Sequence, residues 1–548
     1  MHIKRSDWLI FLALMVLPFL VFGRSLFHDF APIDDWFLIV ENLSVHGITF
    51  ANLKAIFTTY DPELYIPFTL LTFQINYVMA ELQPFVYHLT NILLHGANGV
   101  LVYFIFRRST LGRSLPFVCA LIFLLHPIQT ETVVWIAGRK DLLSTFFYLL
   151  SFLFYVRYRN GIRTSYALSV IFFVCALLSK AMAMTLPAVL ILYDLLIARR
   201  RIDRTFIADK IPYVLLSILF IVIALGGKER VIGSSSALDT ILMAGKSSVF
   251  YIQQIFLPWN FSVYYPQVTD ISLLKAEFFI PLLLVLAAIA LAIFFHRKHP
   301  MISFGILFYF ITLSPTFLNF HKGQVIFFAV DRYAYLPFIG ILLIIIAVIN
   351  PLFHRIRFPQ KFVLIMSMLM ILLLSILSIR QTEIWETGER LFSHALGLYP
   401  RSLNARIDLA RIHRERGEYQ KAFDLLKEGL ALGDHSALRL NAGVIYARTG
   451  DVQSATEQFE KAKVMDPLNP EPHFYLGSLW EQTNNPTLAR EAYTKAVELD
   501  PSYVIARIRL AQLLIADGEI DEAKTQLQEA IRWNPNSVEA REALNKIL

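Results

Sequence analysis

The first 380 residues alternate between long apolar runs and short polar connections, a pattern typical of a chain that crosses a membrane many times. The first run lacks a small-x-small cleavage site, so we expect an uncleaved membrane helix with its N-terminus inside. Counting the runs long enough to cross the hydrocarbon core, the sequence predicts eleven spans. They lie at 8–22, 85–106, 115–130, 142–158, 165–180, 182–198, 211–226, 278–295, 301–319, 334–350 and 361–379.

Two further segments are apolar but interrupted by polar side chains. Residues 66–80 are short for a span and contain two threonines, a glutamine and an asparagine, which favours an amphipathic helix lying at the membrane surface. Residues 241–257 contain a lysine and two glutamines, and we expect an external or re-entrant segment there. With both left out of the count, the basic clusters near 107–113 and 199–210 fall on the same side as the N-terminus. The positive-inside rule then places the N-terminus inside and the C-terminus outside.

From residue 381 the apolar runs stop and a helical repeat of 34 residues begins. Successive units occupy 403–435, 436–469, 470–503 and 504–537, with a partial unit ahead of them. In the clearest unit, small residues allow two antiparallel helices to approach and large ones fill the space between them. Those positions are Leu476, Gly477, Trp480, Ala489, Tyr493, Ala496 and Pro501. This is the tetratricopeptide pattern, and such arrays form a superhelix with a concave binding face.

Composition agrees with this division into two parts. Hydrophobic residues make up 56% of the 548, and the two cysteines, Cys119 and Cys175, lie inside apolar runs, so no disulfide framework is indicated. The net charge of +7 reflects the basic loops of a membrane protein, and nothing indicates nucleic-acid binding. We therefore predict an all-α protein with a multi-span membrane domain at 1–380 and a tetratricopeptide-repeat superhelix at 381–548.

Polar residues that suit catalysis gather on the outer side of the predicted topology. Two adjacent carboxylates just past a membrane helix are costly to hold there and usually have a function. A carboxylate can take the proton from an acceptor hydroxyl, while lysine or arginine neutralises a departing phosphate. The candidates are Asp34, Asp35, His126, Glu131, Arg139, Lys140, Lys180 and Arg332.

Each candidate also has an ordinary structural interpretation. Asp34 and Asp35 suit a solvated loop or a helix cap, Arg139 and Lys140 suit interfacial anchors, and Lys180 at a span end can reach the headgroups. Other candidates fit as a local pair between Asp331 and Arg332 or as helix-end contacts of His126 and Glu131. No spacing of His, Asp and Glu predicts a metal site.

Six motifs in a fixed order, followed by the repeats, carry a resemblance to a known family. They are Asp34-Asp35-Trp36, Tyr65-Ile66-Pro67, Tyr87 to His95, Leu125-His126-Pro127 with Gly138 to Asp141, Leu178-Ser179-Lys180, and Arg332 to Pro337. Together they resemble the transmembrane and tetratricopeptide-repeat protein O-mannosyltransferases (TMTC) and their bacterial relatives. The eukaryotic members have longer repeat arrays, and the four units here favour a bacterial relative.

The resemblance implies a C-type glycosyltransferase (GT-C) fold and a polyprenyl-phosphate sugar as the donor substrate, without a metal or other cofactor. It implies transfer of mannose to protein Ser or Thr with inversion, and a catalytic carboxylate in the first external loop. Carried over by position, Asp34 and Asp35 become the catalytic candidates, with Asp35 preferred. Arg139, Lys140, Lys180 and Arg332 become candidates for the lipid phosphate, with His126 and Glu131 as possible donor or acceptor contacts.

We therefore expect a membrane glycosyltransferase acting outside the cytosol, with repeats that hold the acceptor or a partner protein. The expected location is a bacterial inner membrane with periplasmic repeats, or the endoplasmic reticulum in a eukaryotic cell. The alternative is a non-catalytic membrane-anchored tetratricopeptide scaffold for cell-envelope assemblies. Dense polar residues on one membrane face argue against that alternative, because an anchor needs few of them. A lipid or sugar transporter would instead carry ionisable residues deep within the spans.

Overall fold

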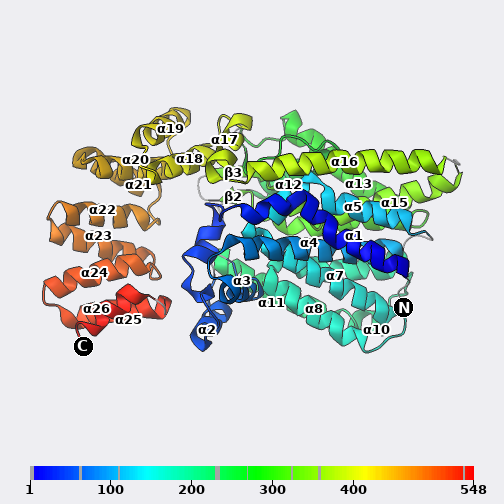
Figure 1. Ribbon diagram of the computed structural model, residues 1–548, viewed down its shortest axis with the longest axis horizontal. Helices are drawn as coiled ribbons and strands as arrows, with labels where there is room; N and C mark the ends of the chain where they lie inside the picture. The colour runs from blue at the N-terminus through cyan, green and yellow to red at the C-terminus, as the bar shows by residue number, and fades with distance from the viewer. Residues whose placement is uncertain are drawn as a thin grey trace. The chain divides into compact units, whose positions relative to one another are not determined.

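The chain divides into two compact units, whose helices and strands are labelled in Figure 1. The computed structural model describes residues 5–60, 64–108, 112–228, 235–267, 269–322, 325–355, 359–534 and 537–548. Unit 1 comprises Met1–Val40 and Ile56–Leu391, and unit 2 comprises Glu41–Ala55 and Phe392–Leu548. The boundary predicted between residues 380 and 381 lies inside helix α16 (Gln360–Ile384).

Within the described ranges, six helical segments of unit 1 are long and apolar enough to cross a membrane. This makes unit 1 a membrane domain. Helix α5 (Ser114–Leu125) and the segment Pro127–Val134 pass the same test together, but they are bent by 49°. The six segments correspond to α1 (Arg5–Phe22), α4 (Pro84–Arg107), α11 (Ile211–Lys228), α13 (Ala276–Phe295), α14 (Pro300–Leu313) and α16.

The other predicted spans are helical but shorter, broken or more polar, so the count of eleven remains a prediction. Residues 142–158 lie in α7 (Arg139–Arg159), and all but the last of residues 165–180 lie in the 15-residue α8 (Ser165–Ser179). Residues 182–198 form the broken run Ala181–Ile197, and α15 (Phe338–Arg355) covers most of 334–350. The bent pair at Ser114–Val134 accounts for 115–130.

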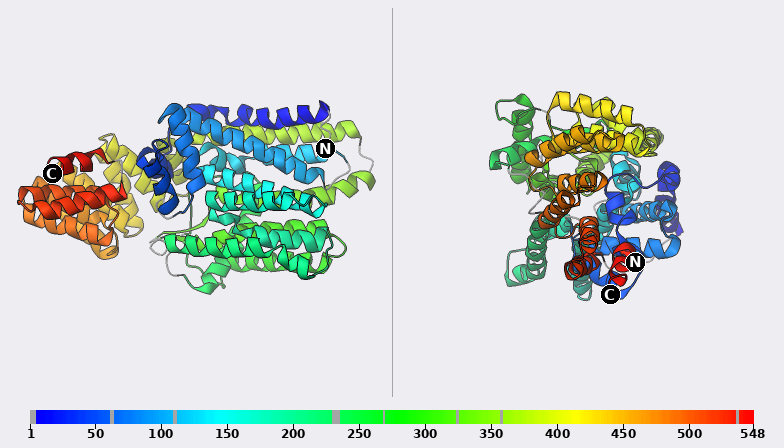
Figure 2. Two further views of the ribbon diagram at one scale, coloured as in Figure 1. Left: turned by 90° about the horizontal axis from the view of Figure 1, so that it is seen from below. Right: turned by 90° about the vertical axis from the view of Figure 1, so that its left-hand side faces the viewer.

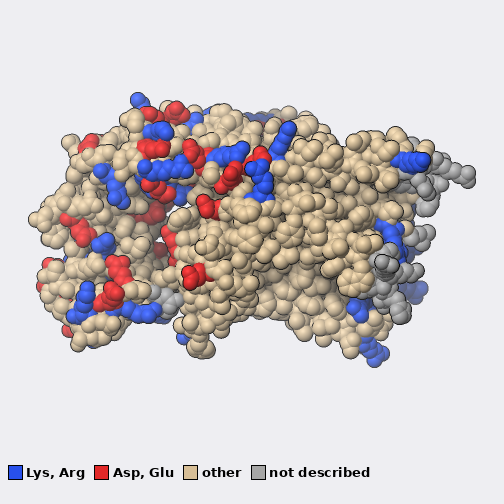
Figure 3. Space-filling model, viewed as in Figure 1, with Lys and Arg blue, Asp and Glu red and all other residues tan. Residues whose placement is uncertain are grey.

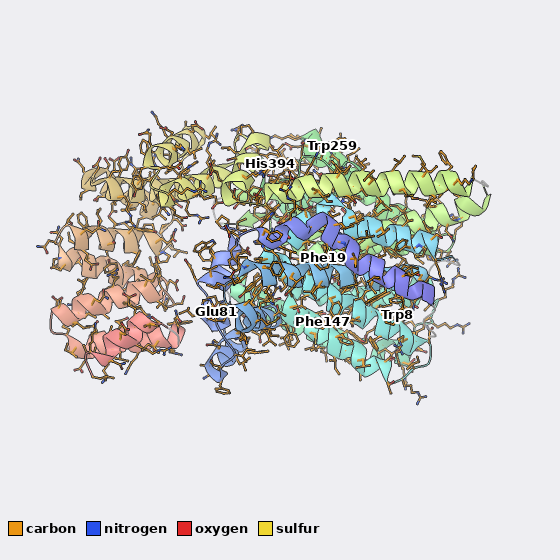
Figure 4. All side chains as sticks on the ribbon, in the orientation of Figure 1. Trp8, Phe19, Glu81, Phe147, Trp259 and His394 are labelled. Carbon is orange, nitrogen blue, oxygen red and sulfur yellow. The ribbon has the colours of Figure 1, made fainter. Side chains whose placement is uncertain are left out.

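The surface of unit 1 explains why these helices suit a membrane. Large apolar side chains on α11, α13 and α16 are exposed, which is tolerated where lipid rather than water surrounds them. Trp8, near the start of α1 (Figure 4), is 60% exposed. On the face shown in Figure 3, unit 1 has a broad area without charged side chains, with Lys and Arg gathered at one end of it. On this face the charged side chains lie toward the ends of the helices, where headgroups and water can solvate them.

The long helices of unit 1 pack side by side, as both views in Figure 2 show for α1 and α16. Helices α14 and α15 approach each other closely where glycines of the two helices face each other. A Cβ on Gly305 would lie 2.7 Å from the Gly340 carbonyl oxygen, and one on Gly340 would lie 2.6 Å from the Gly305 oxygen. Small residues that let backbones touch are the usual means of packing helices in lipid.

Both ambiguous segments form regular helices. Residues 66–80 correspond to α3 (Pro67–Ala80), and residues 241–257 to most of α12 (Ala237–Phe256), a continuous helix that packs on α13. Lys246 of α12 pairs with Glu277 of α13 at 2.6 Å. Neither helix is among the six candidate spans, and their depth in the membrane remains a prediction.

A small antiparallel sheet is the one addition to the predicted all-α fold within the described residues. Its strand order is β1-β3-β2, with bounds Tyr265–Pro266, Val325–Ala329 and His321–Lys322. The sheet leads into the short 3-10 turn Asp331–Ala334 that carries Arg332. The chain is otherwise mostly helical, as predicted.

Unit 2 contains the predicted array of paired helices. The clearest unit pairs α22 with α23, and a Cβ on Gly477 would lie 2.7 Å from the Tyr493 ring, so this contact requires glycine. The predicted pairing of small and large residues is therefore confirmed. The helices are α17 (Gly388–Leu398), α18 (Leu403–Glu415), α19 (Tyr419–Leu432), α20 (Ser436–Thr449), α21 (Val452–Met465), α22 (Glu471–Gln482), α23 (Pro486–Leu499), α24 (Val504–Ala516), α25 (Ile520–Trp533) and α26 (Val538–Asn545), the first of which begins in unit 1.

Candidate active site

The two adjacent aspartates have opposite environments. Asp35 is completely buried, and its two carboxylate oxygens accept the backbone N–H groups of Ala31 at 2.9 Å and Ala137 at 2.7 Å. Burial raises the pKa of Asp35 to about 7, although these two hydrogen bonds act against the rise. The Asp35 carboxylate therefore holds the loop after α1 against the turn that precedes α7.

Asp34 is the member of the pair that faces open space. Its side chain is 43% exposed, and its Oδ2 atom lies 3.0 Å from Nζ of Lys140, which is almost fully buried. The structure thus places Asp34 at the open space and Asp35, the preferred candidate, in the interior, and which of the two is the base remains a prediction. A base must reach the proton that it removes, and Asp35 has no exposed oxygen with which to do so.

The turn between α5 and α7 fixes the position of Lys140. The chain bends at His126, forms the short helix α6 (Thr130–Val134), and enters α7 directly after Gly138. Gly138 has ordinary helical angles, with φ at −60°, so its backbone conformation does not require glycine. Space does require it, because a Cβ there would lie 2.4 Å from the Thr132 carbonyl oxygen.

We expect Gly138→Ala to destabilise the protein by about 1 to 3 kcal/mol, since an overpacked Cβ can be relieved only by moving backbone. The turn would move with it, and Lys140 would lose its position beside Asp34. Thermal stability in detergent, followed by fluorescence-detected size-exclusion chromatography, measures the effect. Gly23→Ala is the matched control, because a Cβ at Gly23 meets no atom within 4 Å. Equal stability of the two variants would contradict the expectation.

Arg139 points away from Lys140 into the protein interior. It is completely buried, its Nε donates to Asn91 Oδ1 at 2.9 Å, and its Nη2 donates to the Tyr87 carbonyl at 2.7 Å. Nη1 donates to Asn76, and the guanidinium lies 4.6 Å from the centre of the Phe73 ring. Its donors are thus engaged by protein groups, and the structure does not place Arg139 with the other phosphate candidates.

Three cations do come together, each paired with a carboxylate. Lys140 pairs with Asp34 as described, Nζ of Lys180 lies 2.6 Å from Asp141 Oδ1, and Arg332 pairs with Glu131. Burial disfavours the charged form of Arg332, but the acidic groups around it, Glu131 foremost, together outweigh this and hold the pKa of Arg332 above its ordinary value.

Two aromatic rings lie between these cations. Lys140 Nζ and the Arg332 guanidinium lie 4.8 and 4.7 Å from the Trp135 ring centre, and Lys180 Nζ lies 5.5 Å from that of Tyr333. Cation–π contacts of this kind favour positive charge in a partly desolvated place. The cations are thereby held near one another without being neutralised by the rings.

The three cations and Asp34 border a cavity of about 190 Å³ in unit 1. These four side chains form its charged wall, and its apolar wall takes its largest contribution from α11. The lining consists of Asp34, Leu64, Tyr65, Ile66, Lys140, Lys180, Ala181, Met182, Met184, Phe220, Ile221, Ile223, Ala224, Leu225, Pro315, Leu318, Asn319, Arg332 and Tyr333. The cavity thus joins a concentration of positive charge to a hydrophobic surface.

His126 and Glu131 do not line this cavity. His126 is buried, with Nε2 at 2.9 Å from the Ile255 carbonyl and Nδ1 accepting the Ile128 N–H at 3.1 Å, so it joins two helical segments. The Glu131 carboxylate accepts hydrogen bonds from both the guanidinium and the backbone N–H of Arg332. Their placement supports the structural interpretation of both residues and not direct contact with a substrate.

Sequence reasoning included Asp141 and Tyr333 in its motifs but gave them no role, and it missed the apolar wall on α11. Asp141 follows Lys140 directly and belongs to the fourth motif, so its proximity was a usable signal. The wall was not recognisable, because Phe220 to Leu225 read like any lipid-facing stretch of a membrane helix. Among the described residues, no group of three or more His, Cys, Asp or Glu is arranged to hold a metal ion.

Fold and site together define a helical membrane protein with a C-terminal array of tetratricopeptide repeats. Sequence models described as tetratricopeptide repeat match residues 402–433, 440–504 and 482–547. A solved structure described as YrrB, a TPR protein with an unusual peptide-binding site, is 23% identical and covers 28% of this chain and 81% of its own, with a TM-score of 0.25.

Curated relatives extend the likeness to the membrane domain. The human "Protein O-mannosyl-transferase TMTC3" is 33% identical over 192 residues, covering 32% of this chain and 20% of that protein. The human "Protein O-mannosyl-transferase TMTC1" is 26% identical over 487 residues, covering 77% of this chain and 55% of that protein. Mouse "Protein O-mannosyl-transferase TMTC4" is 31% identical over 231 residues, 36% of this chain and 31% of that protein. The chain spans about half the length of these relatives or less, and the resemblance to the TMTC family is confirmed.

Proposed function

We propose that this protein is a membrane glycosyltransferase that moves a sugar from a polyprenyl-phosphate donor to a hydroxyl acceptor. The cavity carries this proposal, because its two walls match the two halves of such a donor. The names of the relatives support mannose as the sugar and protein Ser or Thr as the acceptor.

The charged wall suits the donor phosphate. Lys140, Lys180 and Arg332 border one cavity, and a phosphate among them would gain charge-assisted hydrogen bonds. The apolar wall suits the prenyl chain. Phe220 and Leu225 of this wall lie on α11, and the outer side of α11 exposes large apolar side chains, as a lipid-facing helix does. The chain could then continue from the cavity into the bilayer without crossing polar protein.

In this proposal Asp34 serves as the general base, which its partly exposed carboxylate at the cavity supports. It would take the proton of the acceptor hydroxyl as that oxygen attacks C1 of the sugar on the face opposite the phosphate, inverting C1. The bond between C1 and the phosphate oxygen breaks, and its electron pair leaves with the lipid phosphate. The Lys140 ammonium, 3.0 Å from Asp34 Oδ2, holds this carboxylate at the edge of the cavity. The three cations stabilise the negative charge that grows on the leaving group.

The pKa of Asp35 would suit a base, but geometry takes precedence over pKa in choosing one. A buried carboxylate that accepts two backbone N–H groups cannot approach an acceptor hydroxyl without breaking both bonds. Asp35 therefore acts as a positioning residue in this mechanism, because it fixes the loop that carries Asp34.

The remaining features of the proposal concern the membrane and the repeats. We keep the GT-C fold and the eleven-span topology, with an inside N-terminus and extracytoplasmic repeats, in a bacterial inner membrane or the endoplasmic reticulum. The repeats would hold the protein acceptor, since tetratricopeptide arrays present a concave binding face.

Membranes that contain the protein should transfer radiolabelled mannose from polyprenyl-phosphate mannose to endogenous protein. The label should be released by β-elimination, as expected for a sugar linked to Ser or Thr. Membranes without the protein provide the background, and polyprenyl-phosphate glucose tests the choice of sugar. Transfer from polyprenyl-phosphate glucose alone would replace mannose by glucose in the proposal and leave the proposed reaction type unchanged. If correctly inserted protein transfers sugar from neither donor, the proposed enzymatic activity is contradicted, and the membrane-anchored scaffold is favoured.

A further inference from the structure

A second, smaller chamber of about 20 Å³ adjoins the cavity in unit 1. The two share Lys180, Met182, Arg332 and Tyr333 in their linings, so the chamber lies beside two of the three cations. Neither Asp34 nor the apolar residues of α11 line it. The residues that complete it are Asp141, Ser144, Thr145, Ala183, Thr312, Tyr335, Leu336 and Pro337.

Two polar atoms of the chamber's residues are buried without a hydrogen-bond partner in the part of the chain that the structure describes. They are Oδ2 of Asp141, an acceptor, and Nε of Arg332, a donor. The other carboxylate oxygen of Asp141 accepts from Lys180, and other nitrogens of Arg332 hold Glu131. A buried carboxylate oxygen without a partner is costly, so its retention calls for a group that fills the place.

The hydroxyls of Ser144 and Thr312 do not supply that group. Ser144 Oγ donates to the Ala176 carbonyl at 3.1 Å, and Thr312 Oγ1 donates to the Phe308 carbonyl at 2.7 Å. Both protons are therefore used within the protein. Asp141 Oδ2 and Arg332 Nε thus remain as an acceptor and a donor without a partner, on two residues that line a space for about one or two water-sized groups. A hydroxyl matches this description, because it accepts one hydrogen bond and donates another.

We propose that Asp141 and Arg332 form the subsite for one hydroxyl group of the donor sugar, with Asp141 determining which sugar is accepted. This rests on the proposed glycosyl transfer. The sugar is bonded directly to the phosphate, so a phosphate among Lys140, Lys180 and Arg332 places the sugar next to this chamber. The acceptor hydroxyl must instead meet Asp34, and the prenyl chain must follow the apolar residues of α11. Neither Asp34 nor those α11 residues line the chamber.

The test compares polyprenyl-phosphate mannose with its 2-, 3-, 4- and 6-deoxy analogues. For wild-type protein, kcat/KM should fall about 10- to 100-fold with one analogue, because that donor leaves Asp141 Oδ2 and Arg332 Nε unpaired. Asp141→Asn should use the parent donor about 10- to 100-fold less well, since its amide turns an NH₂ group toward the chamber while its oxygen stays on Lys180. The same analogue should then cost Asp141→Asn no further activity. The effects on kcat/KM of removing the sugar hydroxyl and of removing its partner carboxylate are thus expected to be non-additive.

Ser144→Ala is the matched control, since Ser144 lines the same chamber but its proton is already used. It should keep the wild-type discrimination among the analogues. If Asp141→Asn turns over too slowly, competition binding of the five donors gives the same comparison. Equal use of all analogues by wild type would mean that a water fills the chamber, and discrimination retained in Asp141→Asn would leave Asp141 a structural role. Either result overturns the subsite, whereas a wild type inactive with every donor overturns the glycosyl transfer itself.

Discussion

Asp34→Asn should abolish sugar transfer while leaving donor binding nearly unchanged. The amide cannot accept a proton, and loss of a general base typically costs 10²- to 10⁴-fold in rate. Donor binding should persist, because Lys140, Lys180 and Arg332 all remain and Lys140 is freed from its carboxylate partner. The measurement is kcat for mannose transfer, together with donor binding by competition, on protein that elutes as a single species from size exclusion.

Asp29→Asn is the matched control, because Asp29 is an exposed carboxylate of the same loop that does not line the cavity. It should transfer sugar at the wild-type rate. Asp35→Asn should behave differently from both, with less folded protein, since an amide NH₂ cannot accept a backbone N–H. Full activity in Asp34→Asn, with activity lost in a well-folded Asp35→Asn, would return the role of base to Asp35.

The repeats and the membrane helices were predictable because their signals are local. Gly477 and Tyr493 meet within one repeat, so the spacing of small and large residues along the chain already defines the contact. Apolar runs likewise report burial in lipid without reference to any other part of the fold. For helices shorter than a full span, such as α8, the apolar run alone does not predict the depth in the membrane, because neighbouring helices decide how they are buried.

The candidate site was predictable as a set of motifs but not as a set of roles. Lys140 and Asp34 are 106 residues apart, and no periodicity connects them. Neighbours in sequence took opposite directions: Asp34 faces the cavity while Asp35 is buried, and Lys140 faces it while Arg139 is buried. Consecutive residues at a helix start or in a loop point to different sides, so a motif identifies the place without identifying the atom that acts.

Arg139 illustrates how a residue can be essential to such a site without touching a substrate. Its partner Asn91 uses the amide nitrogen to hold the Trp135 carbonyl at 3.0 Å, and Trp135 in turn lies between Lys140 and Arg332. The guanidinium thus supports the turn on which the cations are arranged. The presence of Arg139 in a motif is therefore explained by this structural support, and it does not require a bond between Arg139 and phosphate.

Arg139→Lys should therefore lower stability without raising the KM for the donor. A lysine keeps the charge but cannot reproduce the planar fork that reaches Asn91, Asn76 and Tyr87, so buried acceptors lose their partners at a cost of about 3 kcal/mol in total. Thermal stability in detergent should fall, and the protein that remains folded should bind donor as wild type does. Lys180→Gln provides the contrast, since it removes a cation that lines the cavity and should raise the donor KM. A phosphate ligand at Arg139 would give the opposite result, a raised KM with stability retained, because lysine is a poor substitute for a bidentate contact.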